Sequence, residues 1–245
     1  MRDYGDVTRR VEALDADSIE LRVLGEADGY PIYRASARGG DDLPCLLVIG
    51  GTHGDEPSGV EAALAFLERE AINWVGAMRF EVIPCLNPFG YVHDKHRNPA
   101  DVDLNWSFDR LDLPDIGVVR GLVEGRRFAC VVDLHEDWES RGFYLYELRR
   151  SGEKIGRRIV DRVQQVGPIN ESPVIEGVPA KAGVIHPDLD TVELRRRGEG
   201  IPLNIYKAHT DHLITSEMPT TCPMAERVEA HLITLRSMIR AHEPG

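Results

Sequence analysis

The fold of this chain is decided by one stretch, Leu43-Pro44-Cys45-Leu46-Leu47-Val48-Ile49-Gly50-Gly51-Thr52-His53-Gly54-Asp55-Glu56-Pro57. Its first half is almost continuously apolar, which is typical of a central strand covered on both faces. Two glycines then allow the backbone to turn tightly, and Pro57 suits the first turn of a helix. The residues that follow keep an apolar face at the spacing of a helix: Val60, Ala63, Leu64 and Leu67.

The rest of the chain repeats this alternation of strands and helices. Apolar runs predict further central strands at Arg79–Pro84 and Phe128–Leu134, and alternating residues predict an opening hairpin from Ser18–Val23 and Pro31–Ala37. Helix patterns cover Ile116–Gly125, Glu153–Val166 and a C-terminal segment that follows Pro223. We therefore predict an α/β fold in one domain over residues 1–245, a three-layer α/β/α sandwich around a mixed, largely parallel twisted sheet.

One region departs from this pattern. Glu171–Ile201 is rich in proline and glycine and is expected to be an extended insertion or loop. It contains the basic run Arg195-Arg196-Arg197, for which an exposed, solvated face is the expected role.

Composition excludes several classes of function. The chain has 245 residues, with 29 Lys and Arg against 41 Asp and Glu, a formal charge of −12. This acidity, without a basic tract, argues against nucleic-acid and membrane partners. The N-terminus has no apolar signal-peptide core, and no apolar run approaches the roughly 20 residues that span a bilayer. A cytoplasmic protein is expected, and its oligomeric state is left open.

Polar residues that could bind a metal follow two of the predicted central strands. His53 and Glu56 stand three residues apart before a predicted helix, and His135 follows the strand that ends at Leu134. Two histidines, one glutamate and a water form the open set of a catalytic zinc site. The four cysteines contain no C-x-x-C pair, so a cysteine-held zinc is not expected. Taken alone, His53 and Glu56 do not establish a metal site, because a histidine at a strand end is more often part of a structural hydrogen bond than a ligand, and H-x-x-E occurs by chance in many chains.

Five ordered motifs add a family resemblance. They are Gly50-Gly51-Thr52-His53-Gly54-Asp55-Glu56, Asn87-Pro88-Phe89-Gly90-Tyr91, Arg97 with Asp103-Leu104-Asn105, Asp133-Leu134-His135, and Thr215-Ser216-Glu217-Met218-Pro219. Together they resemble the zinc carboxypeptidase superfamily, which includes the metallocarboxypeptidases and the aspartoacylase/succinylglutamate desuccinylase branch. The resemblance spans roughly residues 43 to 235.

The resemblance implies a metal site and a general base. His53, Glu56 and His135 match the family's three zinc ligands, with one Zn²⁺ per chain. Glu217 matches the glutamate that takes a proton from zinc-bound water and passes it to the leaving nitrogen.

Other residues would support the site. Asp103 resembles the aspartate that braces the first histidine, and Asp133 lies two residues before His135, on the same side of a strand. Arg97 matches an arginine that holds the developing oxyanion or the substrate. Asn105 matches an asparagine that contacts the substrate's carboxylate. Trp106 is a departure, because most relatives carry there an arginine that grips this carboxylate, and tryptophan cannot form that ion pair.

These residues predict a zinc-dependent hydrolase that cleaves a peptide or peptide-like amide. A small-molecule deacylase of the aspartoacylase/succinylglutamate desuccinylase type, acting on an N-acyl amino-acid-like substrate, is the alternative. The context Glu217-Met218-Pro219 favours the peptidase, whereas Gly50–Gly54 suits both. A third reading is a metal-binding homologue without catalysis, but such a domain would have no need for Glu217 or Arg97.

Overall fold

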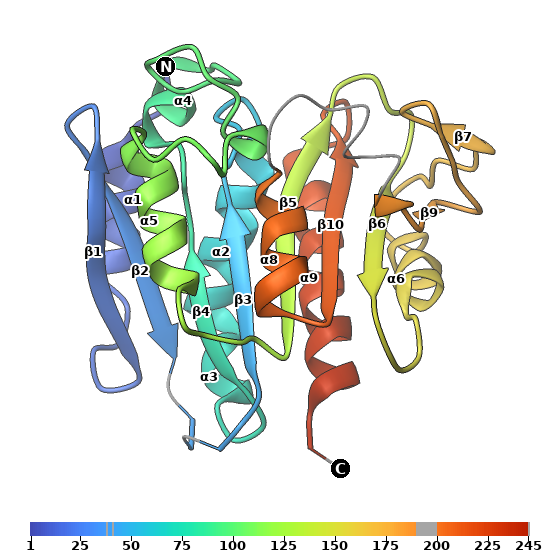
Figure 1. Cartoon of the computed structure of the whole chain (residues 1–245), viewed down its shortest axis with the longest axis horizontal. Helices are drawn as coiled ribbons and strands as arrows, with labels where there is room; N and C mark the ends of the chain where they lie inside the picture. The colour runs from blue at the N-terminus through green and yellow to red at the C-terminus, as the bar shows by residue number, and fades with distance from the viewer. Residues whose placement is uncertain (38, 41, 190–199, 245) are drawn as a thin grey trace.

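A computed structural model of the chain describes residues 1–37, 39–40, 42–189 and 200–244. In this part of the chain the main sheet has eight strands (Figure 1). Their spatial order is β1 (Ile19–Ala27), β2 (Tyr30–Ala37), β4 (Arg79–Ile83), β3 (Cys45–Gly50), β5 (Cys130–Asp137), β10 (His212–Pro219), β6 (Tyr144–Arg149) and β9 (Val184–Ile185).

The sheet is mixed and mostly parallel, as the sequence predicted. The four central strands, β4, β3, β5 and β10, are parallel to one another. Antiparallel pairing joins β2 to β4 and β6 to β10 at their two sides. The predicted opening hairpin is confirmed as β1 and β2, which pair antiparallel. The carboxyl ends of β3, β5 and β10 consequently meet at one edge of the sheet, where sites of α/β proteins form.

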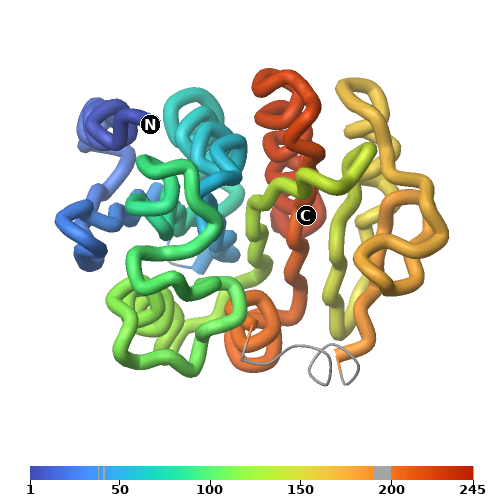
Figure 2. Tube along the Cα trace, turned by 90° about the horizontal axis from the view of Figure 1, so that it is seen from above, coloured from blue at the N-terminus to red at the C-terminus, as the bar shows by residue number. Residues whose placement is uncertain are grey.

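Side chains of the central strands alternate between two hydrophobic cores, which is why these strands read as continuously apolar. Leu46 and Val48 of β3 belong to one core, and Leu47 and Ile49 belong to the other. All four are buried. Viewed from above, helices lie on both sides of the sheet (Figure 2). The three-layer architecture is therefore confirmed.

The helices of the two outer layers differ in the core that they cover. α2 (Pro57–Arg69), α6 (Gly156–Val163) and α9 (Met224–His242) pack on one side, and α5 (Pro114–Val123) and α8 (Ile201–His209) pack on the other. All predicted helices are present, although α5 and α6 have shifted ends. Other helical elements are α1 (Tyr4–Glu12), α3 (Ala71–Trp74), α4 (Pro88–His93) and the 3₁₀ turn η1 (Leu104–Trp106).

The described part of the predicted insertion contains three short strands. β7 (Val174–Ile175) and β8 (Val178–Pro179) form a separate two-stranded sheet, and β9 joins the edge of the main sheet. The basic run Arg195-Arg196-Arg197 lies outside the described residues. Among the helices that are described, none is both long and apolar enough to cross a bilayer.

Candidate active site

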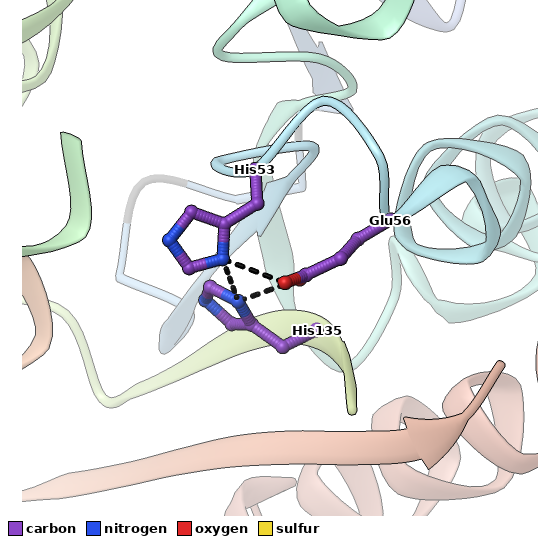
Figure 3. Close-up of side chains that lie close together, drawn as sticks. All are labelled: His53, Glu56 and His135. Atoms are coloured by element: carbon purple, nitrogen blue, oxygen red, sulfur yellow. Dashed lines mark hydrogen bonds and ion pairs between the residues drawn. The ribbon is translucent and has the colours of Figure 1, made fainter. Parts of the chain in front are cut away.

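The candidate metal centre forms where β3 and β5 end. His53 lies in the loop after β3, whose turn requires Gly51 at a φ of +61°. Glu56 lies directly before the first turn of α2, and His135 is part of β5. Figure 3 shows the two rings and the carboxylate pointing toward one another. Residues that are distant in sequence thus meet because parallel strands end at the same edge of the sheet.

The distances between the three side chains suit a common ligand. Nδ1 of His53 lies 2.7 Å from Oε1 of Glu56, and Nδ1 of His135 lies 2.9 Å from Oε2. The two Nδ1 atoms are 3.2 Å apart. Donor atoms placed tetrahedrally at zinc-ligand bond lengths are separated by about 3.3 Å. Two imidazoles and a carboxylate are also the donor types that zinc accepts, so these residues fit the ion that the sequence predicts.

The carboxylates near His53 and His135 raise the pKa values of both imidazoles. Burial lowers the pKa of His53, but the charge of Glu56 and hydrogen bonds with Asp103 and Glu56 raise it to about 9. The pKa of His135 is raised well above its usual value, because Asp133 and Glu56 outweigh its burial. Histidines bind metals in their neutral form, so a metal that binds here would displace protons from these rings.

Both predicted supporting carboxylates lie next to the histidines that they were expected to brace. Oδ1 of Asp103 is 3.1 Å from Nε2 of His53. Oδ2 of Asp133 is 3.1 Å from Nε2 of His135, and its other oxygen accepts a hydrogen bond from Thr52. Each carboxylate thus faces the ring nitrogen that points away from the centre, the arrangement that orients metal-binding imidazoles.

A cavity of about 710 Å³ opens over the cluster, within the usual range for ligand sites. Glu217, Asn105 and Trp106 line it. Glu217 is the β10 residue that pairs with His135 in the parallel register. Burial and the neighbouring Glu56 raise the pKa of Glu217 well above its usual range, although His135 opposes them. Trp106 belongs to η1 and packs against Gly200 at the start of α8.

Arg97 is not among the described residues that line the cavity. Its guanidinium donates a hydrogen bond to the carbonyl oxygen of Asp101, and 52% of its side chain is exposed. The structure therefore does not bring Arg97 together with the other predicted residues, and its predicted role stays a prediction. No lysine or arginine lines the described part of this cavity.

His96, which the sequence analysis did not single out, lines the cavity instead. Its ring stacks on His53, with the centroids 3.7 Å apart. It also belongs to two groups of side chains that could hold a metal, one with His53 and Asp103 and one with Asp55 and Glu56. A single histidine in a loop has no spacing that marks it, and its position next to Arg97 was the only available signal.

Comparisons with known proteins support the fold. No protein-family profile and no curated sequence matches the chain. Among solved structures, it is similar to a candidate metallopeptidase from Shewanella amazonensis (TM-score 0.82, 20% identity, 99% of this chain and 92% of that one).

Similarity extends to larger carboxypeptidases. One is a metallo-carboxypeptidase from Burkholderia cenocepacia (TM-score 0.68, 16% identity, 97% of this chain and 68% of that one). Another is carboxypeptidase A from Helicoverpa armigera (TM-score 0.71, 16% identity, 98% of this chain and 74% of that one). The structure thus shows that this chain has the carboxypeptidase fold, as the sequence motifs predicted.

Proposed function

We propose that this protein is a zinc-dependent hydrolase that cleaves peptide or peptide-like amide bonds. The observation that carries the proposal is the convergence of His53, Glu56 and His135 in the lining of a cavity that Glu217 also lines. The solved structures with the same fold include a metallo-carboxypeptidase and a carboxypeptidase A.

His53, Glu56 and His135 would hold the ion. When bound, zinc supplies a Lewis acid that polarises a carbonyl and lowers the pKa of water. Glu217 takes a proton from the attacking water and delivers it to the nitrogen of the leaving amine. Burial raises the pKa of Glu217, so this carboxylate accepts a proton more readily than an exposed glutamate does. Asn105 and Trp106 would contact the substrate, since both line the cavity.

Glu217→Gln tests the base. The amide keeps the shape of the side chain but cannot accept the proton, so we expect kcat to fall at least about 10²-fold. The zinc content per chain should remain that of the wild type, because Glu217 is not among the three grouped donors. Substrates would be N-acetylated dipeptides, their C-terminal amides and N-acetyl amino acids, assayed together with elemental analysis.

Glu171→Gln provides a matched control, because this exposed glutamate does not line the cavity. A fully active Glu217→Gln protein would remove Glu217 from the mechanism, and loss of zinc with activity would make it a ligand instead. Cleavage of N-acetyl amino acids alone would favour the deacylase. Rejection of the amidated dipeptides would show that a cation grips the free carboxylate.

A further inference from the structure

A second buried glutamate, Glu136, lies directly after His135 and joins β5 to the start of α2. Its side chain has no exposed surface. Oε1 of Glu136 accepts a hydrogen bond from the backbone amide of Ser58, with 2.6 Å between the two atoms. In the opposite direction, the backbone amide of Glu136 donates to Oε2 of Glu56 over 3.0 Å. Two hydrogen bonds that run in opposite directions thus link the end of β5 to the first turn of α2.

The start of α2 takes this acceptor from outside the helix. Amides in the first turn of a helix have no partner within it, and the side chain of the preceding residue usually supplies one. That residue here is Glu56, whose side chain makes no such bond. It points toward His53 and His135 instead (Figure 3). Glu136 therefore caps α2 from a neighbouring strand, and the Glu56 carboxylate stays available to the candidate metal centre.

Arg227 of α9 offsets the charge of Glu136. One of its guanidinium nitrogens donates to Oε2 of Glu136, the oxygen that does not bind Ser58, and only 13% of the arginine side chain is exposed. A buried carboxylate without a partner is costly, and a second uncompensated negative charge beside Glu56 would repel it. Both oxygens of Glu136 are thus engaged by the protein, and Glu136 is not among the described side chains grouped as metal donors.

We propose that Glu136 is a positioning residue for Glu56. As a hydrogen-bond acceptor it fixes the first turn of α2 to the end of β5, and this fixes the carboxylate that meets His53 and His135. The proposal rests on the proposed function, since it concerns the metal site of that hydrolase. The capping bond requires the acceptor and not the charge, because a neutral side-chain oxygen also accepts a hydrogen bond from an amide.

Two double substitutions in the full chain separate the acceptor from the charge. Glu136→Gln with Arg227→Met, the Gln variant, keeps a side-chain oxygen for the Ser58 amide. Glu136→Met with Arg227→Met, the Met variant, removes it. Each variant loses one negative and one positive charge, so the net charge is unchanged. We expect the zinc dissociation constant, measured by chelator competition, to rise about 10–100-fold in the Met variant and to stay within about threefold of the wild type in the Gln variant.

Co²⁺ loaded in place of zinc reports on the geometry of the ligands, because its visible absorption depends on its coordination. The spectrum should change in the Met variant and match the wild type in the Gln variant. Arg236→Met is the control for the contact between α9 and α2, because Arg236 of α9 binds the carboxylate of Glu70 at the other end of α2, with two distances of 2.9 Å. This variant should keep the wild-type zinc dissociation constant and Co²⁺ spectrum.

Equal zinc dissociation constants in the Met and Gln variants, whether raised or unchanged, would overturn the positioning role. An equal loss in Arg236→Met would also overturn it, by assigning the effect to the packing of α9. A wild type that binds zinc but cleaves none of the amides would overturn the proposed function alone, and one that binds no zinc would overturn both. Thermal melting checks that each variant is folded. If the Met variant is not, Glu136→Asp replaces it, because its carboxylate is one methylene shorter, and an unchanged zinc dissociation constant there would contradict the proposal.

Discussion

At the scale of single residues, we expect Asp133 to help orient His135. This carboxylate is almost fully buried and lies 3.1 Å from the ring nitrogen that points away from the candidate metal centre. Asp133→Asn removes its charge while keeping its size. We expect zinc affinity to fall about 10–100-fold, the usual effect of removing the group that orients a metal-binding histidine.

Competition with a chelator measures this affinity. Asp211→Asn is the control, because Asp211 is an exposed carboxylate that pairs with Arg127 and Arg150 and does not line the cavity. Equal zinc dissociation constants for wild type and Asp133→Asn would show that the carboxylate does not support the site.

The predicted site residues differ in how directly their positions follow from the sequence, for a physical reason. Asp133 and His135 are two apart on a strand, so their common side follows from the period of the strand. His53 and Glu56 are fixed by a strand end and a helix start. Arg97 lies in an irregular turn, where side-chain direction depends on local hydrogen bonds such as those of Asn98. Sequence spacing carries no information about these bonds, so the motif pointed to Arg97 while the ring of His96 faces the cavity.

At the scale of elements, the loop after β3 must lie directly against α4. A Cβ atom at Gly54 would lie 1.9 Å from the carbonyl carbon of Gly90. The atoms that this Cβ would meet belong to the backbone of Gly90 and Tyr91, so they cannot rotate away as a side chain could. We expect Gly54→Ala to lower the free energy of unfolding by about 2 kcal/mol or more and to weaken zinc binding by displacing His53.

Gly117→Ala is the matched comparison. This glycine lies inside α5, and a Cβ there would meet no atom within 4 Å. Replacing a helical glycine by alanine should stabilise the protein by about 0.5–1 kcal/mol. Urea denaturation measures both variants, and a Gly54→Ala protein as stable as the wild type would contradict the close approach.

Helices and strands with a clear apolar periodicity could be predicted from the sequence. Those that form only through packing against distant parts of the chain could not. β3 and α2 carry an apolar run and an apolar helical face. α1, in contrast, lies in a charged segment, and its three buried residues, Tyr4, Val7 and Val11, join a small core that includes residues of β2 and α4. Such a helix is stabilised by tertiary packing rather than by its own propensity. The long-range contacts that decide it are not visible in the local sequence.

At the scale of the whole molecule, one buried histidine joins three elements behind the candidate site. His231 of α9 is fully buried. One ring nitrogen lies 3.2 Å from the hydroxyl of Ser58 in α2, and the other lies 2.9 Å from the hydroxyl of Ser216 in β10. These serines lie two residues after Glu56 and one before Glu217. The packing of α2 and α9 on the sheet thus includes a buried imidazole, and burial favours its neutral form.

The burial of His231 predicts how the free energy of unfolding changes with pH. Burial, the largest cause, and the charge of His135 lower the pKa of His231 from 6.5 to about 3. Between these values the unfolded chain binds a proton that the folded chain does not. The contribution of the neutral His231 to the free energy of unfolding is therefore fully present above about pH 6.5. It is lost as the pH falls toward 3. From pH 7 to pH 5 the loss from this residue should be about 2 kcal/mol.

His231→Gln isolates the effect, because glutamine can still hydrogen-bond to a serine but does not titrate. Urea denaturation of chelator-treated wild type and variant at pH 7, 6 and 5 gives the free energy of unfolding of each. The other titrating groups are shared and cancel in the difference. We expect the advantage of the wild type over the variant to shrink by about 2 kcal/mol between pH 7 and pH 5. A difference that is constant across this range would mean that His231 accepts a proton in the folded protein as readily as in the unfolded chain, and acid sensitivity would then have to originate elsewhere.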